Sequence, residues 1–140
     1  MKVNPSNAKA YFELGKIQKE LNKAENGLQY FERAIELDPQ NAELFNEYGI
    51  LQGSLQRHQA ASELFHKCLG LNPKMASAHA NLGKIYLDTG DPDSAIQHYQ
   101  LALQLQSNLL IALLGLGHAY RALGKNLEAM ISYDQALEVD

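Results

Sequence analysis

The chain has 140 residues, of which 46% are hydrophobic and 20% charged, and its formal net charge is −4. This length and composition are ordinary for one globular domain. Its 12 basic and 16 acidic residues are well mixed, which disfavours nucleic acid and anionic membranes as primary partners. The single cysteine, Cys68, excludes an internal disulfide and a metal site built from several cysteines.

Targeting and membrane-spanning segments are not visible in the sequence. It contains neither a signal peptide nor an apolar stretch long enough to cross a bilayer. We therefore expect a cytoplasmic location and no direct membrane insertion.

Apolar periodicity and helix-breaking residues predict eight helices. Proline ends a helix in Leu37-Asp38-Pro39, because it lacks the N–H donor and disfavours helix before it. Asp91 is suited to cap the helix that follows it, and Gly90 and Gly124 suit the left-handed residue that commonly ends a helix. In chain order the expected helices are Asn7–Glu20, Ala24–Leu37, Asn41–Ser54, Gln59–Leu71, Met75–Asp88, Pro92–Leu105, Leu109–Ala122 and Leu127–Val139.

A fixed spacing runs through these helices. Glycine recurs every 34 residues (49−15, 83−49 and 117−83), and such a period marks a stacked repeat array. Each glycine is followed after twelve residues by a small residue, and after sixteen by an aromatic one. A glycine inside a helix costs about 1 kcal/mol relative to alanine, so four in register indicate close approach of the paired helix. The positions are Gly15, Gly49, Gly83 and Gly117, then Gly27, Ala61, Ala95 and Ala129, then Phe31, Phe65, Tyr99 and Tyr133.

Together these residues resemble the tetratricopeptide repeat (TPR), whose pattern is W-x2-L-G-x2-Y…A-x3-F…P. The resemblance implies an all-α fold, a right-handed α-solenoid (superhelix) of four helix–turn–helix TPR units with eight antiparallel helices. It covers residues 1–140 as a single array, with repeats at 8–41, 42–75, 76–109 and 110–140. The last repeat is incomplete and lacks a C-terminal capping helix, and Val3-Asn4-Pro5 resembles the tail of a preceding repeat. We therefore expect a part of a longer TPR protein.

Residues for catalysis or metal binding do not form a recognisable motif. The five histidines lack metal-ligand spacing, and the sequence has no phosphate-binding loop and no nucleophile elbow. His79 and His98 could approach each other across a helix pair, but His79 occupies an aromatic core position. Cys68 stands where the other repeats have alanine, so we expect a small buried residue. We expect no enzymatic activity, no metal and no cofactor.

A binding surface is the remaining candidate site. In TPR arrays the first helix of every unit lines a concave groove that accepts an extended peptide or a helix. Several residues at these positions are apolar where a purely solvated face would be polar. A carboxylate clamp is disfavoured, because Asn81 alone matches it in its best register. The expected groove residues are Phe12, Lys16, Asn46, Ile50, Asn81, Lys84, Ile111, Leu114, His118 and Arg121.

The sequence thus predicts a scaffold or adaptor that binds a protein or peptide partner. Two alternatives stay open. The chain could be a substrate-recognition or regulatory region of a larger enzyme, such as a glycosyltransferase. It could also be a self-associating module, a homo-oligomer formed through uncapped terminal repeats.

Overall fold

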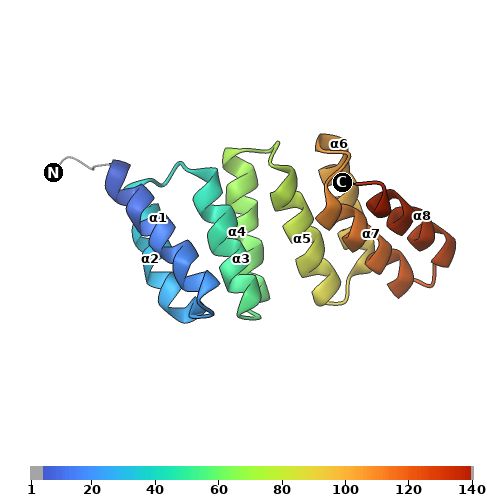
Figure 1. The fold of residues 1–140 in the computed structure, drawn as a ribbon, viewed down its shortest axis with the longest axis horizontal. Coiled ribbons are helices and arrows are strands. Elements are labelled where there is room, and N and C mark those ends of the chain that lie inside the picture. The colour runs from blue at the N-terminus through green and yellow to red at the C-terminus, as the bar shows by residue number, and fades with distance from the viewer. Residues whose placement is uncertain (1–4, 140) are drawn as a thin grey trace. The chain divides into compact units, whose positions relative to one another are not determined.

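The structure is a computed structural model that describes residues 5–139. All its regular elements within that range are α-helices, and Figure 1 shows them in chain order. The expected all-α fold is confirmed, and each expected helix end lies within two residues of the observed one. The eight helices are α1 (Pro5–Glu20), α2 (Ala24–Leu37), α3 (Ala42–Ser54), α4 (His58–Leu71), α5 (Ala76–Asp88), α6 (Pro92–Leu105), α7 (Leu110–Ala122) and α8 (Asn126–Leu137).

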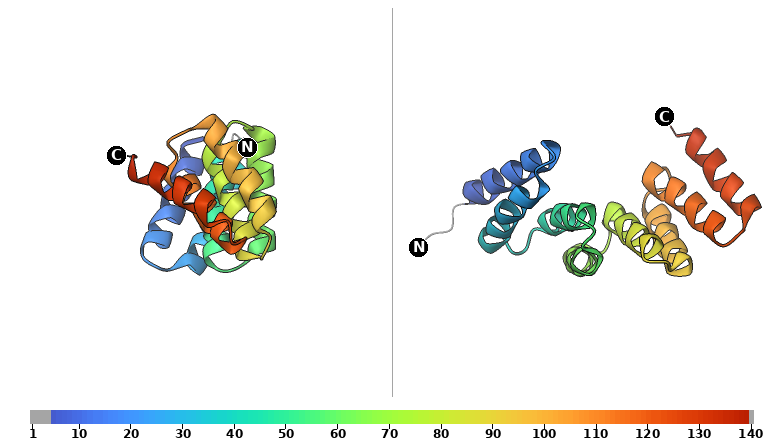
Figure 2. Two further views of the ribbon diagram at one scale, coloured as in Figure 1. Left: turned by 90° about the vertical axis from the view of Figure 1, so that its right-hand side faces the viewer. Right: turned by 90° about the horizontal axis from the view of Figure 1, so that it is seen from below.

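The helices are grouped in two compact units, one ending at Pro73 and the next beginning at Lys74. Unit 1 holds α1 to α4, in which α1 packs on α2, α2 on α3, and α3 on α4. Unit 2 repeats this order, with α5 on α6, α6 on α7, and α7 on α8. Figure 2 shows the helix pairs within each unit from two further sides. A single array over residues 1–140 with the repeat limits given above stays a prediction.

The repeated glycines allow paired helices to approach closely, as the 34-residue spacing indicates. In the first pair, a Cβ atom on Gly27 would lie 3.2 Å from the carbonyl oxygen of Gly15, so the small residue does face the glycine. The nearest group to the repeated glycine is nevertheless the aromatic ring sixteen residues later. A Cβ atom would lie 3.0 Å from Phe31 at Gly15, 2.7 Å from Phe65 at Gly49, 2.8 Å from Tyr99 at Gly83 and 2.5 Å from Tyr133 at Gly117.

The core of unit 2 is built around Tyr99, one of the largest fully buried side chains. Its ring lies against Gly83 of α5 and also against Gly115 of α7, where a Cβ atom would overlap the ring. One side chain from α6 therefore fills the space between α6 and both neighbouring helices. In unit 1 the corresponding ring, Phe31, is likewise buried and stacks on Tyr48 of α3, with ring centroids 6.0 Å apart.

Turns inside the helix pairs share one backbone conformation. The expected left-handed glycines are confirmed, since φ is +88° at Gly90 and +73° at Gly124. The two earlier repeats have the same conformation at Asn22 (φ 58°) and Gln56 (φ 62°), each a multiple of 34 residues from the glycines. The expected cap is also present, because Asp91 accepts a hydrogen bond of 3.1 Å from the backbone N–H of Ser94.

Replacing Gln56 by glycine should stabilise unit 1. A side chain in the left-handed region crowds the following carbonyl group, and glycine removes this strain at some cost in unfolded-chain entropy. We expect a gain of about 1 kcal/mol in the free energy of unfolding. Denaturant titration followed by circular dichroism measures it. Lys67→Gly, within the ordinary helix α4, is the control and should lose about 1 kcal/mol. A loss of stability in Gln56→Gly would contradict the argument.

Candidate partner-binding surfaces

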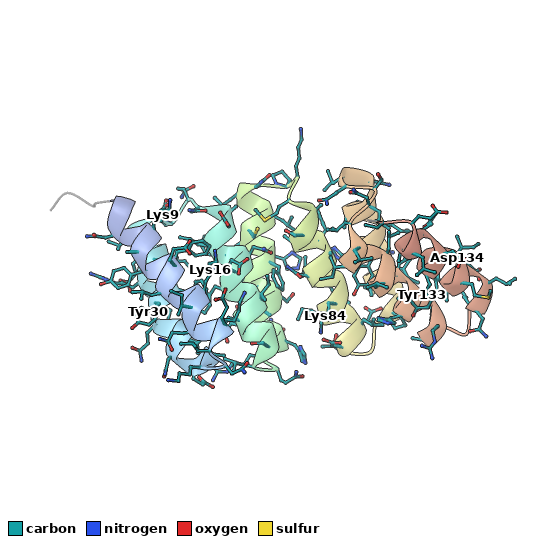
Figure 3. The ribbon with its side chains drawn as sticks, in the orientation of Figure 1. Lys9, Lys16, Tyr30, Lys84, Tyr133 and Asp134 are labelled. Carbon is teal, nitrogen blue, oxygen red and sulfur yellow. The ribbon has the colours of Figure 1, made fainter. Side chains whose placement is uncertain are left out.

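In unit 1, a cleft of about 360 Å³ lies beside α1 and the start of α3. Two expected groove residues, Phe12 and Lys16, line it together with Lys9; both lysines are labelled on α1 in Figure 3. The ammonium group of Lys16 is 5.1 Å from the ring centroid of Phe12 and 3.5 Å from a carboxylate oxygen of Glu13. Both contacts are partly exposed, so each adds little to stability but holds a cation at the cleft.

The other expected residues of unit 1 present less surface. Phe12 belongs to the core and packs edge-to-face on Phe31, which leaves only its rim at the cleft. Asn46 is buried and already has an interaction partner, and Ile50 is half-buried. Periodicity assigns residues to a face of α3 but does not show how deeply neighbouring helices cover that face.

Sequence reasoning missed an ion pair between α1 and α3. The Lys19 ammonium group lies 3.0 Å from a carboxylate oxygen of Glu47, and both side chains are largely covered. An unpaired Glu47 would repel an acidic ligand, but the ion pair partly neutralises its charge. The spacing of Lys16 and Lys19 along α1 does not show which residue of α3 Lys19 meets, so the sequence contains no signal for this pair.

In unit 2, α7 exposes four expected groove residues along one face: Ile111, Leu114, His118 and Arg121. The opposite face of this helix is buried, with Ala112 and Leu116 in the core. The His118 ring meets the Tyr133 ring of α8 edge-to-face at 5.7 Å. The structure therefore brings together an apolar pair near the start of α7 and two nitrogen-bearing side chains near its end.

The expected groove residues on α5 already have interaction partners within the chain. Lys84 is labelled on α5 in Figure 3. Its ammonium group is 2.7 Å from a carboxylate oxygen of Asp88, four residues along the same exposed face. Asn81 is half-buried and has an interaction partner. The cationic side of the surface in unit 2 thus depends mainly on α7.

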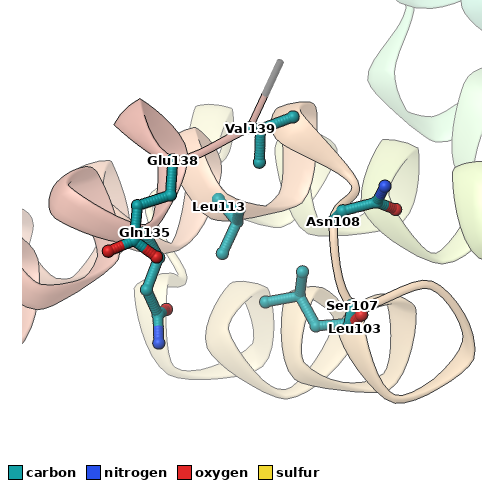
Figure 4. A pocket seen from close by; sticks show the side chains of 7 residues that line it. All are labelled: Leu103, Ser107, Asn108, Leu113, Gln135, Glu138 and Val139. Atoms are coloured by element: carbon teal, nitrogen blue, oxygen red, sulfur yellow. The ribbon is translucent and has the colours of Figure 1, made fainter.

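Unit 2 also has a cavity, of about 680 Å³, which lies between the α6–α7 connection and the end of α8 (Figure 4). None of the expected groove residues lines it. It contains amide, hydroxyl and apolar side chains with one carboxylate, and this mixture does not indicate a particular class of ligand. Its lining is Leu103, Ser107, Asn108, Leu113, Gln135, Glu138 and Val139.

The histidines and the cysteine have structural surroundings. His79 and His98 do approach across α5 and α6, with stacked rings 6.0 Å apart, and Tyr86 stacks on His98 at 5.2 Å. Within residues 5–139, no group of three His, Cys, Asp or Glu side chains could hold a metal ion. Cys68 is fully buried, and burial raises the pKa of its thiol to about 11, so the thiol stays protonated at neutral pH.

Helix pairs repeated at a fixed period define a helical repeat protein. Sequence profiles described as tetratricopeptide repeat match residues 8–41, 40–108 and 74–140. These matches cover most of the chain, which therefore belongs to the tetratricopeptide repeat family. The fold of this family is generally that of protein-interaction scaffolds.

Solved structures agree on the fold. A crystal structure of MamA superposes with a TM-score of 0.84 and 26% identity, over 96% of this chain and 79% of that one. A second MamA crystal structure superposes with a TM-score of 0.82 and 26% identity, over 96% of this chain and 73% of that one. PilF of Pseudomonas aeruginosa superposes with a TM-score of 0.87 and 21% identity, over 98% of this chain and 63% of that one. Comparison with curated proteins finds no match. None of the helices in the described part of the chain is long and apolar enough to cross a membrane.

Proposed function

We propose that the chain is a scaffold or adaptor that captures a peptide or helical segment of a partner protein, with α7 as its main anchor. The observation that supports this is the exposed apolar pair Ile111 and Leu114, on a helix whose other face already packs in the core. Exposed apolar side chains next to each other favour burial by a partner.

Comparison among repeats strengthens the case for Ile111. The corresponding positions, one, two and three periods earlier, carry Ser77, Glu43 and Lys9. Packing of the repeat therefore does not require an apolar residue at this position. Isoleucine here is a feature of α7 alone, which suits a role in recognition better than one in folding.

The neighbouring groups indicate the chemistry of the partner. His118 and Arg121 lie one and two turns beyond the apolar pair, so a segment with apolar side chains followed by an acidic one would fit. The helix is already formed, and binding would require little ordering of the protein. Lys16 and the rim of Phe12 offer a similar but smaller combination in unit 1.

Selection of peptides from a random displayed library, followed by calorimetry, tests the proposal. We expect Ile111→Asp and Leu114→Asp to weaken the selected peptide at least about tenfold, because each places a charge at an apolar anchor. Leu105→Asp is the matched control, since Leu105 and Ile111 are both 44% exposed. Unchanged affinity in both α7 variants, or failure to select any peptide, would refute the assignment.

A further inference from the structure

Tyr99 of α6 carries a hydroxyl group that the packing of the core does not require. The corresponding rings of unit 1, Phe31 and Phe65, are equally buried and have no hydroxyl. A polar group that enters a core without a hydrogen bond lowers the stability of the fold. The hydroxyl of Tyr99 therefore suggests a use outside the core.

The end of the Tyr99 ring reaches Gly115 of α7. A Cβ atom on Gly115 would lie 2.6 Å from the hydroxyl oxygen, so a side chain at this position would displace the hydroxyl. Gly115 follows Tyr99 by sixteen residues. The two phenylalanines of unit 1 are followed at the same distance by Glu47 and Asn81. Tyrosine and the glycine that makes room for its hydroxyl thus occur together in unit 2.

Gly115 borders the exposed face of α7. It follows Ile111 by four residues and precedes His118 by three, so the three positions lie on successive turns along one side of the helix. Ile111 and His118 are exposed, whereas Gly115 is buried. The Tyr99 hydroxyl therefore lies at the edge of the surface that we assign to the partner.

The Tyr99 hydroxyl is available as a hydrogen-bond donor. Burial and the charge of Asp88 raise its pKa, so the group stays protonated at neutral pH. In the part of the chain that the structure describes, it has no hydrogen-bond partner, and it is not closed off from solvent as the Tyr133 hydroxyl is. A protonated hydroxyl in this state can donate to an acceptor atom from outside the chain.

The charge of Asp88 restricts which acceptor fits. Its carboxylate lies 2.7 Å from the ammonium group of Lys84, yet its charge still acts on the Tyr99 hydroxyl. The same charge would repel a carboxylate of the ligand at this point but not a neutral carbonyl oxygen. The acceptor that fits is therefore an amide carbonyl, and an acidic side chain of the ligand fits better farther along α7.

We propose that the Tyr99 hydroxyl donates a hydrogen bond to a backbone carbonyl oxygen of the captured segment, and that this segment binds in an extended conformation. In a helix, the carbonyl groups before the last turn already accept hydrogen bonds within the helix. An extended segment leaves its carbonyl groups free to accept one from its receptor. This inference rests on the proposed function of α7 and specifies the form of its ligand.

Calorimetry with a peptide selected on the native chain tests the role of the hydroxyl. Tyr99→Phe removes the hydroxyl and keeps the ring. We expect the affinity to fall about 3- to 10-fold, as for the loss of one hydrogen bond. Tyr120→Phe is the matched control, because Tyr120 lies nine residues after Ile111, on the opposite side of α7. It should leave the affinity unchanged.

Replacing the amide bonds of the peptide by esters, one at a time, locates the carbonyl group. An ester carbonyl is a weaker acceptor than an amide carbonyl. At one position we expect the ester to weaken binding to the native chain clearly more than binding to Tyr99→Phe, from which the hydrogen bond is already missing. Such a double-mutant cycle separates a direct contact from an effect of Tyr99 on the fold.

Three outcomes would overturn the proposal. They are an unchanged affinity in Tyr99→Phe, ester effects that are equal in both chains at every position, and a gain of helix content by the peptide on binding, followed by circular dichroism. In each case Ile111→Asp still tests the α7 surface separately, because a loss of affinity in that variant would support the surface without the hydrogen bond. Failure to select any peptide would refute both proposals.

Discussion

Replacing Gly83 by leucine should destabilise unit 2 by about 3 kcal/mol, because it forces new atoms into a closed contact. A Cβ atom on Gly83 would already lie 2.8 Å from Cε1 of Tyr99, before the rest of the leucine is added. The ring has no room to move away, since Gly115 of α7 closes its other side. The substitution must therefore separate α5 from α6, which exposes part of the core.

Thermal and denaturant unfolding of the full chain, followed by circular dichroism, measure this effect. Gly70→Leu is the matched control, because Gly70 lies in a helix and no atom beyond the adjoining turns of that helix lies within 4 Å of a Cβ placed there. The better helix propensity of leucine should make that variant more stable by up to about 1 kcal/mol. A melting temperature for Gly83→Leu equal to that of the native chain would disprove the packing argument.

The helices and their pairing could be predicted because they depend on signals repeated along the chain. The 34-residue glycine spacing, the proline at residue 39 and the cap at Asp91 each act locally, and the structure confirms the helices that they delimit. The close approach of paired helices was also predictable, because a glycine inside a helix needs a compensating contact. The aromatic ring that makes most of that contact also lies at a constant spacing, sixteen residues after each repeated glycine.

Two features could not be obtained in the same way. The left-handed turns at Asn22 and Gln56 follow the same period as Gly90, but neither residue type demands that conformation, so the residue types alone do not predict them. The burial of Asn46 and Phe12 depends on how far a neighbouring helix covers them, which periodicity within one helix does not give. The groove role of the expected residues stays a prediction at every position.

Replacing Tyr99 by alanine should cost unit 2 about 3–5 kcal/mol, since it empties the space between three helices. The side chain is 2% exposed and is the one aromatic residue among the buried members of its core cluster. Tyr99→Phe should cost less than about 1 kcal/mol, because it keeps the ring and preserves most of the volume. Phenylalanine already fills this place at Phe31 and Phe65.

Combining Tyr99→Ala with Gly83→Ala separates the ring contact from other effects of glycine. In the native chain Gly83→Ala should destabilise unit 2, because the Cβ atom of the alanine meets the Tyr99 ring. Without the ring, the higher helix propensity of alanine, about 1 kcal/mol, should dominate, so the same substitution becomes stabilising. The four free energies of unfolding form a double-mutant cycle, and this change of sign is its expected result. If the two substitutions were additive, glycine at this position would serve a purpose other than making room for Tyr99.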